Sequence, residues 1–139
     1  MSDDDFALSY LSITSLFQQQ FEVPAIQRPF AWTDHQAIDV VRDIQSLIGK
    51  HRVNNGANHF FGTIVTLPAQ DSEYEPIIDG QQRLTTVTAL GGLLATALDD
   101  LAHEARETAK TLPEGEREQL INISVDVAKK SEALRVLLT

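Results

Sequence analysis

The order of apolar and polar positions divides the chain into helical and extended stretches. Apolar residues recur every three to five positions from about Phe6 to Gln20, which predicts an opening helix that buries one face. A second helical pattern follows Thr33, because Thr33 and Gln36 have the form of a capping box and apolar residues continue at helical spacing to Lys50. We therefore expect two helices separated by a shorter, non-helical segment.

Extended segments are indicated by aromatic and β-branched residues. Residues 60–67 predict a largely buried strand, and residues 74–79 predict a second strand after a polar turn, so the two could pair as a hairpin. Residues 22–24 predict a short strand that ends at a proline. Gly80 is expected to end the strand over 74–79.

A long amphipathic helix is predicted after this glycine. Apolar residues recur in steps of three and four from Gln81 to Ala105, and the pair Gly91 and Gly92 in the middle indicates close packing against another element or a kink. Leu112 and Pro113 end this helix or begin the next one.

The last part of the chain is expected to be helical over 114–135. Alternating apolar residues over 121–125 leave a short strand possible there. Residues 134–139 form an apolar run that stops without a cap, turn or polar tail, so we expect this chain to be an N-terminal fragment that continues into further structure.

Length and composition place the chain among globular proteins. Its 139 residues suit one domain over 1–139, with a core over about 6–110 and a helical tail over 111–139. Apolar residues make up 42% and charged residues 22%, which excludes collagenous and wholly disordered chains. The absence of cysteine excludes disulfides, thiolate metal sites and a cysteine nucleophile.

Charge and hydropathy restrict the partners. A net charge of −9 argues against broad, sequence-independent binding to duplex DNA, which depends on Lys and Arg. The uncharged stretch from Leu84 to Leu98 falls short of the roughly 20 apolar residues that a membrane span needs. The acidic N-terminus does not resemble a secretory signal, so we expect a soluble, cytoplasmic protein with no membrane partner.

Several motifs of known enzymes are missing from the sequence. The four histidines show no metal-ligand spacing, and neither a Walker motif nor a serine nucleophile elbow is present. P-loop NTPases and serine hydrolases are therefore poor interpretations, and any nucleotide site is of another kind.

The most informative segment is residues 77–86, where a β-branched run ends at Asp-Gly and a helix begins at once. The first N–H groups of such a helix have no intrahelical partner, so the turn can hold an anion such as phosphate. Arg83 would supply a forked, permanently charged donor, and Gly80 would allow close approach. Asp79 could cap the helix or hold Mg²⁺ that bridges to a triphosphate. Further neutral donors are Gln81, Gln82, Thr85 and Thr86.

A purely structural interpretation of this segment is also open. Asp-Gly is a common turn, Asp79 can be an ordinary helix cap, and Arg83 can be a surface residue of the first helical turn. The segment becomes more informative because a second polar cluster lies earlier in the chain.

That second cluster lies over residues 27–32, which we expect to form a loop because Arg28 precedes a proline. If the strands pair in one sheet, Gln27 and Arg28 could converge with Arg83 on one anion. Trp32 could stack on a base, although we favour a place in the core. The alternative for Arg28 is a buried ion pair, for which the candidate carboxylates are Asp39, Asp43 and Asp79.

Three segments together resemble the N-terminal domain of GmrSD-type modification-dependent restriction endonucleases, a family formerly classed as a domain of unknown function. They are residues 23–32, residues 59–65 and residues 78–86, and their order and spacing match the family. The sequence D-G-Q-Q-R followed by L-T-T is quite specific. The resemblance covers about residues 6–105.

The resemblance implies an α+β fold similar to the ParB and sulfiredoxin class, with a small mixed sheet, surrounding helices and a long helix after the Asp-Gly-Gln-Gln-Arg turn. The resemblance also implies that this domain is a regulatory module, which binds and hydrolyses a nucleoside triphosphate (GTP, ATP or CTP) with Mg²⁺. The usual bacterial or archaeal parent cleaves modified phage DNA with a C-terminal HNH-type nuclease domain, and an oligomer is possible.

The resemblance also assigns residues to motifs. Gly80 and Arg83 match a Gly-x-x-Arg turn that binds nucleotide phosphates in this class, Asp79, Gln81 and Gln82 complete it, and Gln27 and Arg28 match a second loop motif. Together with the neutral donors, the nucleotide-binding set that we expect is Gln27, Arg28, Gly80, Gln81, Arg83, Thr85 and Thr86. For hydrolysis we expect Asp79, Gln82 and Arg83 to be catalytic, with Asp79 as the possible magnesium ligand. The family commonly has an aromatic residue before its Gln-Arg pair, where this chain has Ile26. Two rival functions remain, namely a ParB-like DNA-binding module without enzymatic activity and an interaction scaffold.

Overall fold

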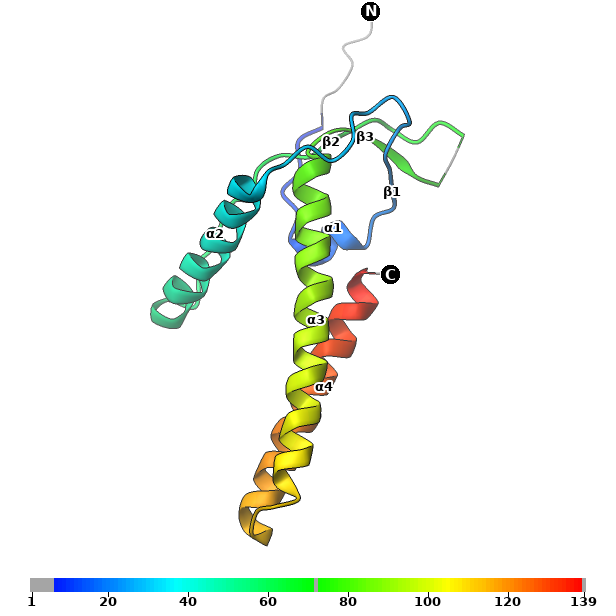
Figure 1. Cartoon of the computed structure of the whole chain (residues 1–139). Coiled ribbons are helices and arrows are strands. Elements are labelled where there is room, and N and C mark those ends of the chain that lie inside the picture. The colour runs from blue at the N-terminus through cyan, green and yellow to red at the C-terminus, as the bar shows by residue number, and fades with distance from the viewer. Residues whose placement is uncertain (1–6, 72, 139) are drawn as a thin grey trace, which may run out of the picture. The chain divides into compact units, whose positions relative to one another are not determined.

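The computed structural model describes residues 7–71 and 73–138, which form four helices and three strands in an α+β arrangement (Figure 1). The chain divides into two compact units. Residues 21–90 form one, here called the sheet unit, and residues 7–20 with 91–138 form the other, here called the hairpin unit.

The sheet unit is built on a small mixed sheet in the order β1-β3-β2. The central strand β3 (Glu75–Asp79) pairs in parallel with β1 (Phe21–Glu22) and antiparallel with β2 (Val65–Thr66). Pairing of β2 with β3 confirms the expected hairpin. Ile77 on β3 is almost completely buried, so the middle of the sheet carries the apolar core of this unit.

Strand β2 is much shorter than the strand expected over residues 60–67. Gly62 has a φ of +102°, a conformation that interrupts an extended strand, and a Cβ at this position would lie 2.7 Å from Arg83 Cζ. The chain therefore bends where the Arg83 side chain packs against its backbone, and regular pairing begins only at Val65.

Helix α2 (Asp34–Val53) confirms the second predicted helix. The Gln36 side chain accepts a hydrogen bond from the Thr33 N–H at 2.9 Å, as the capping box predicts. The following segment is tied back to α2, because His59 Nε2 lies 3.4 Å from Asp43 Oδ2.

Helix α1 (Ile13–Phe17) is much shorter than the helix predicted from Phe6 to Gln20. Phe6 lies outside the described residues, and residues 7–12 are not helical. Ser12 Oγ caps the helix by accepting the Ser15 N–H at 3.0 Å. Short helices need tertiary packing to be stable, and the apolar side chains before Ser12 are exposed, so the helix forms only where it lies against α4.

The hairpin unit consists mainly of α3 from Gly91 onward and of α4. Helix α3 (Gln81–Ala109) confirms the predicted long helix, and α4 (Glu114–Leu138) is continuous, so the alternative of a strand over 121–125 is wrong. The two helices meet through small buried residues at seven-residue spacing, a repeat that returns to the same helical face. These residues are Ala95, Ala102 and Ala109 on α3 and Ser124 and Ser131 on α4.

Side chains near the C-terminus continue this seam. Ser131 Oγ donates to the Ala95 carbonyl at 2.9 Å, and a Cβ on Gly91 would lie 3.1 Å from the Leu138 side chain. Gly91 therefore allows the close packing that was one of the two roles expected for the glycine pair. At Gly92 an added Cβ would have nothing within 4 Å.

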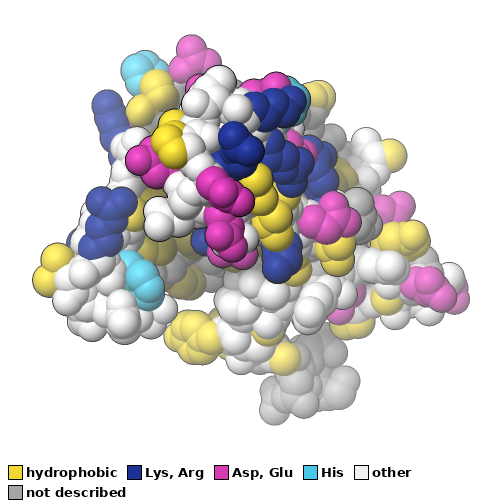
Figure 2. All heavy atoms as spheres, turned by 90° about the horizontal axis from the view of Figure 1, so that it is seen from below, with side chains coloured by type: hydrophobic (Ala, Val, Ile, Leu, Met, Phe, Trp, Pro, Cys, Tyr) yellow, Lys and Arg dark blue, Asp and Glu magenta, His cyan; other side chains and the backbone are white. Residues whose placement is uncertain are grey.

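Charged side chains surround the tip of the hairpin. Viewed from below in Figure 2, Lys and Arg side chains there are interspersed with Asp and Glu side chains. Lys110 Nζ donates to Glu107 at 2.7 Å, which lowers the pKa of the Glu107 carboxyl, and Arg117 Nη2 donates to the Leu112 carbonyl at 3.0 Å. Such alternation differs from the continuous positive surface used in non-specific DNA binding.

Among the described residues one helix, α3, is long and apolar enough to cross a membrane, judged by length and composition alone. Core helices of water-soluble proteins meet the same criterion.

Candidate functional site

The site is built around the sharp turn that joins β3 to α3. Asp79 ends the strand, Gly80 has a φ of +90°, and α3 begins at Gln81. A Cβ on Gly80 would lie 2.8 Å from the Thr63 carbonyl oxygen and 3.0 Å from Ile64 Cα, so no larger residue fits without moving backbone. The turn thus presents the open N-terminal end of a long helix beside the sheet.

Gln82 is buried and joins this turn to the loop over residues 27–32. Its Oε1 accepts the N–H of Ala31 at 2.7 Å and the N–H of Trp32 at 3.3 Å, while its Nε2 donates to the Pro29 carbonyl at 3.4 Å. The loop expected from the sequence is therefore present, and the second residue of α3 holds it.

Arg83 faces a different segment. Its Nη1 donates to the Thr63 carbonyl at 2.6 Å, and its guanidinium packs on the backbone of Gly62. The neighbouring residues Gln82 and Arg83 thereby connect α3 to two separate stretches of chain, which are the other two segments of the family resemblance.

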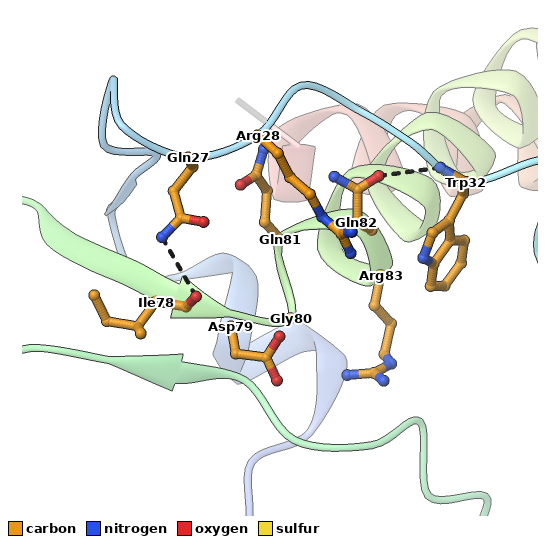
Figure 3. Close-up of a pocket in the computed structure, with 9 residues that line it drawn as sticks. All are labelled: Gln27, Arg28, Trp32, Ile78, Asp79, Gly80, Gln81, Gln82 and Arg83. Atoms are coloured by element: carbon orange, nitrogen blue, oxygen red, sulfur yellow. Dashed lines mark hydrogen bonds between the residues drawn. The ribbon is translucent and has the colours of Figure 1, made fainter.

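Gln27 and Arg28 approach the turn from the loop. Gln27 Nε2 donates to the Ile78 carbonyl at 3.4 Å. Figure 3 shows Arg28 extending from the loop toward the first turn of α3. Arg28 is exposed and has no hydrogen-bond or ion-pair partner among the residues that the structure describes.

These residues line a single cavity of about 110 Å³ in the sheet unit (Figure 3). It brings together most of the residues selected from the sequence and adds Ile78 and Trp32. Its lining consists of Gln27, Arg28, Trp32, Ile78, Asp79, Gly80, Gln81, Gln82 and Arg83. The Trp32 side chain is half-buried and borders the cavity instead of lying wholly in the core.

The two threonines selected from the sequence do not line this cavity. Thr85 is exposed. Thr86 is buried, and its hydroxyl has no hydrogen-bond partner within residues 7–71 and 73–138. Both lie on α3 beyond the turn, so neither contributes to the lining.

The ion-pair alternative for Arg28 is wrong for the described residues. Asp39 lies 3.4 Å from Arg42, Asp43 lies 3.4 Å from His59, and no described carboxylate pairs with Arg28. No group of three potential metal ligands of the His, Cys, Asp or Glu type occurs in the described part of the chain. Asp79 is exposed at the edge of the turn and is the carboxylate that lines the cavity.

Gly62 is a residue of this site that sequence reasoning did not select. A glycine inside an apolar, β-branched run is a signal of a bulge or of close backbone approach, and this signal could have identified it. Its partner, the Arg83 guanidinium, was not identifiable from the sequence, because the two are 21 positions apart, at 62 and 83.

None of the curated proteins matches the chain. The model of the GmrSD restriction endonuclease N-terminal domain matches residues 13–135, which include the turn, the loop over 27–32 and the Gly62 bend. The chain belongs to the family of GmrSD restriction endonuclease N-terminal domains.

Proposed function

We propose that the sheet unit binds the phosphates of a nucleoside triphosphate and acts as a regulatory NTPase module of a restriction endonuclease. The observation that carries this proposal is Arg28, which has no hydrogen-bond or ion-pair partner among the described residues and extends toward the open N-terminal turn of α3. An unpaired guanidinium beside free helical N–H groups is an arrangement that favours phosphate oxygens.

The cavity size indicates which part of a nucleotide it would hold. At about 110 Å³ it is smaller than the roughly 300–1,000 Å³ typical of small-molecule sites. We therefore assign it to phosphates, with Gln81 and the Gly80 backbone beside them, while the sugar and base would lie outside. Trp32 at the border is available for stacking on a base.

The residues that line the cavity fit a magnesium ion that the nucleotide phosphates would hold for the most part. Mg²⁺ in phosphoryl-transfer sites keeps several waters and uses one or two carboxylates plus substrate phosphates, so the single carboxylate of Asp79 is sufficient. Asp79 would hold Mg²⁺, which would supply positive charge to the phosphates, and Arg28 with Arg83 would add positive charge near them.

The remaining expectations follow from family membership. We propose that the fold is ParB/sulfiredoxin-like and that the parent enzyme acts on modified DNA through a further HNH-type nuclease domain. The cytoplasm of a bacterium or archaeon is the proposed location, and nucleotide hydrolysis in this domain would control DNA cleavage in the other.

Isothermal titration with GTP, ATP and CTP, each with and without Mg²⁺, tests the proposal. We expect saturable binding to at least one of them, and a loss of about tenfold or more in Arg28→Ala, since hydrogen bonds to charged groups contribute roughly 1.5–3 kcal/mol. The matched control is Arg42→Ala, which removes an equally charged side chain that pairs with Asp39 on α2, outside the cavity.

Two results would contradict the proposal. The first is wild-type protein that binds none of the three nucleotides. The second is equal weakening by Arg28→Ala and Arg42→Ala, which would indicate a general effect of charge. Salt-sensitive binding of DNA in place of nucleotide would instead support the ParB-like DNA-binding alternative.

A further inference from the structure

Two glutamine side chains, one on each side of Arg28, hold the loop over residues 27–32 by hydrogen bonds, and these contacts are here called tethers. On one side Gln27 Nε2 donates to the Ile78 carbonyl at 3.4 Å, and on the other Gln82 holds the backbone of residues 29–32. Figure 3 shows both tethers and the Arg28 side chain between them. Arg28 itself contacts no described partner that would hold it in place.

The tether made by Gln82 is the stronger of the two. Gln82 is 8% exposed, and its Oε1 accepts two consecutive backbone N–H groups, with the shorter bond at 2.7 Å. An amide oxygen has two lone pairs, so both are in use here. An Oε1 engaged in this way holds the loop and has no lone pair left for a water or a phosphate-bound ion.

We propose that Gln82 is a positioning residue that places Arg28 over the N-terminal turn of α3. This inference rests on the proposed function, because Arg28 is the group that would contact the phosphates. It assigns to Gln82 an indirect effect on binding, through the loop, and predicts that this effect disappears when Arg28 is absent.

A double-mutant cycle tests this coupling. The proteins are the wild type, Gln82→Met, Arg28→Ala and the double variant, each titrated with the nucleotide that the wild type binds. Methionine keeps the volume of the buried side chain and removes its hydrogen bonds. We expect Gln82→Met to weaken binding about tenfold in the wild type and less than about twofold in the Arg28→Ala background, as for directly coupled groups.

A second readout needs no ligand. Trp32 is the only tryptophan in the sequence, and its backbone N–H donates to Gln82 Oε1 at 3.3 Å. Quenching of its fluorescence by acrylamide therefore reports on the loop. We expect faster quenching in Gln82→Met and unchanged quenching in Arg28→Ala, because Arg28 does not hold the loop. Gln82→Asn, whose shorter side chain does not reach the backbone of residues 29–32, replaces Gln82→Met if circular dichroism shows that the latter does not fold.

The outcomes separate this inference from the proposed function. Equal losses of affinity in both backgrounds would show that Gln82 acts independently of Arg28 and would overturn the inference while leaving nucleotide binding intact. A wild type that binds no nucleotide would overturn the proposed function and with it the ligand role of Arg28. If Gln82→Met left the quenching of Trp32 unchanged, Gln82 would not hold the loop, and the inference would be overturned.

Discussion

Replacing Gly80 by alanine tests the account of the turn most directly. The backbone there has a φ of +90°, and the added Cβ would lie 2.8 Å from the Thr63 carbonyl oxygen and 3.0 Å from Ile64 Cα. Because both close atoms belong to backbone, neither can move aside as the end of a side chain would. The substitution should therefore strain the turn and separate β2 from the start of α3.

The magnitude follows from two contributions. A left-handed backbone conformation costs a non-glycine residue about 1–2 kcal/mol, and overpacking against fixed atoms costs about 1–3 kcal/mol. Together they predict a loss of about 2–5 kcal/mol in the free energy of unfolding, a large fraction of the 5–15 kcal/mol that is typical of single domains.

Urea denaturation followed by far-ultraviolet circular dichroism measures this loss. Gly92→Ala is the matched control, because Gly92 lies inside α3 with nothing within 4 Å of an added Cβ. There alanine should stabilise the helix by about 0.5–1 kcal/mol. If Gly80→Ala were as stable as the wild type, or if both variants changed stability in the same direction, the described geometry of the turn would be refuted.

Two further predictions concern charged side chains. Arg83→Ala should lower the free energy of unfolding by about 0.5–1.5 kcal/mol, because it removes an exposed hydrogen bond from the guanidinium to the Thr63 carbonyl; an unchanged urea midpoint would contradict this structural role. The pKa of Asp99 lies below its ordinary value because of the Ser131 hydroxyl and the Arg135 guanidinium. The Ser131 hydroxyl donates to the Ala95 carbonyl, whereas Arg135 Nη2 donates to Asp99 Oδ2 at 2.6 Å. A lowered folded-state pKa means that ionised Asp99 stabilises the fold above the unfolded pKa and that this contribution disappears as pH falls through the folded pKa. Asp99→Asn should therefore have a lower free energy of unfolding than the wild type near neutral pH. The two values should converge as the pH falls below about 4, where Asp protonates in the unfolded chain, and urea denaturation over a pH series measures this. A difference in the free energy of unfolding that stays constant with pH would exclude this ion pair as the cause.

Several features of this protein are determined by its sequence alone. The capping box at Thr33, the Asp-Gly turn and the regular apolar spacing of α3 are local signals, and each predicts an element that the structure contains. Residues 27–28 and 79–83, selected from the sequence, line one cavity, because polar residues that follow strands collect at the ends of the same sheet.

The tertiary structure decided where each of these side chains points. Nothing in D-G-Q-Q-R shows that Gln82 turns toward residues 29–32 while Arg83 turns toward Gly62 and Thr63, because hydrogen-bond partners 20 or more positions away are set by chain packing. The short α1 also depends on tertiary contacts, since apolar periodicity gives a helix only where a partner surface covers it. Strand β2 is short because the chain bends at Gly62, where Arg83 packs against the backbone. Local periodicity and capping therefore determined α2 and α3, whereas the partners of Gln82 and Arg83, and with them the exposure of Arg28, depend on contacts between distant segments.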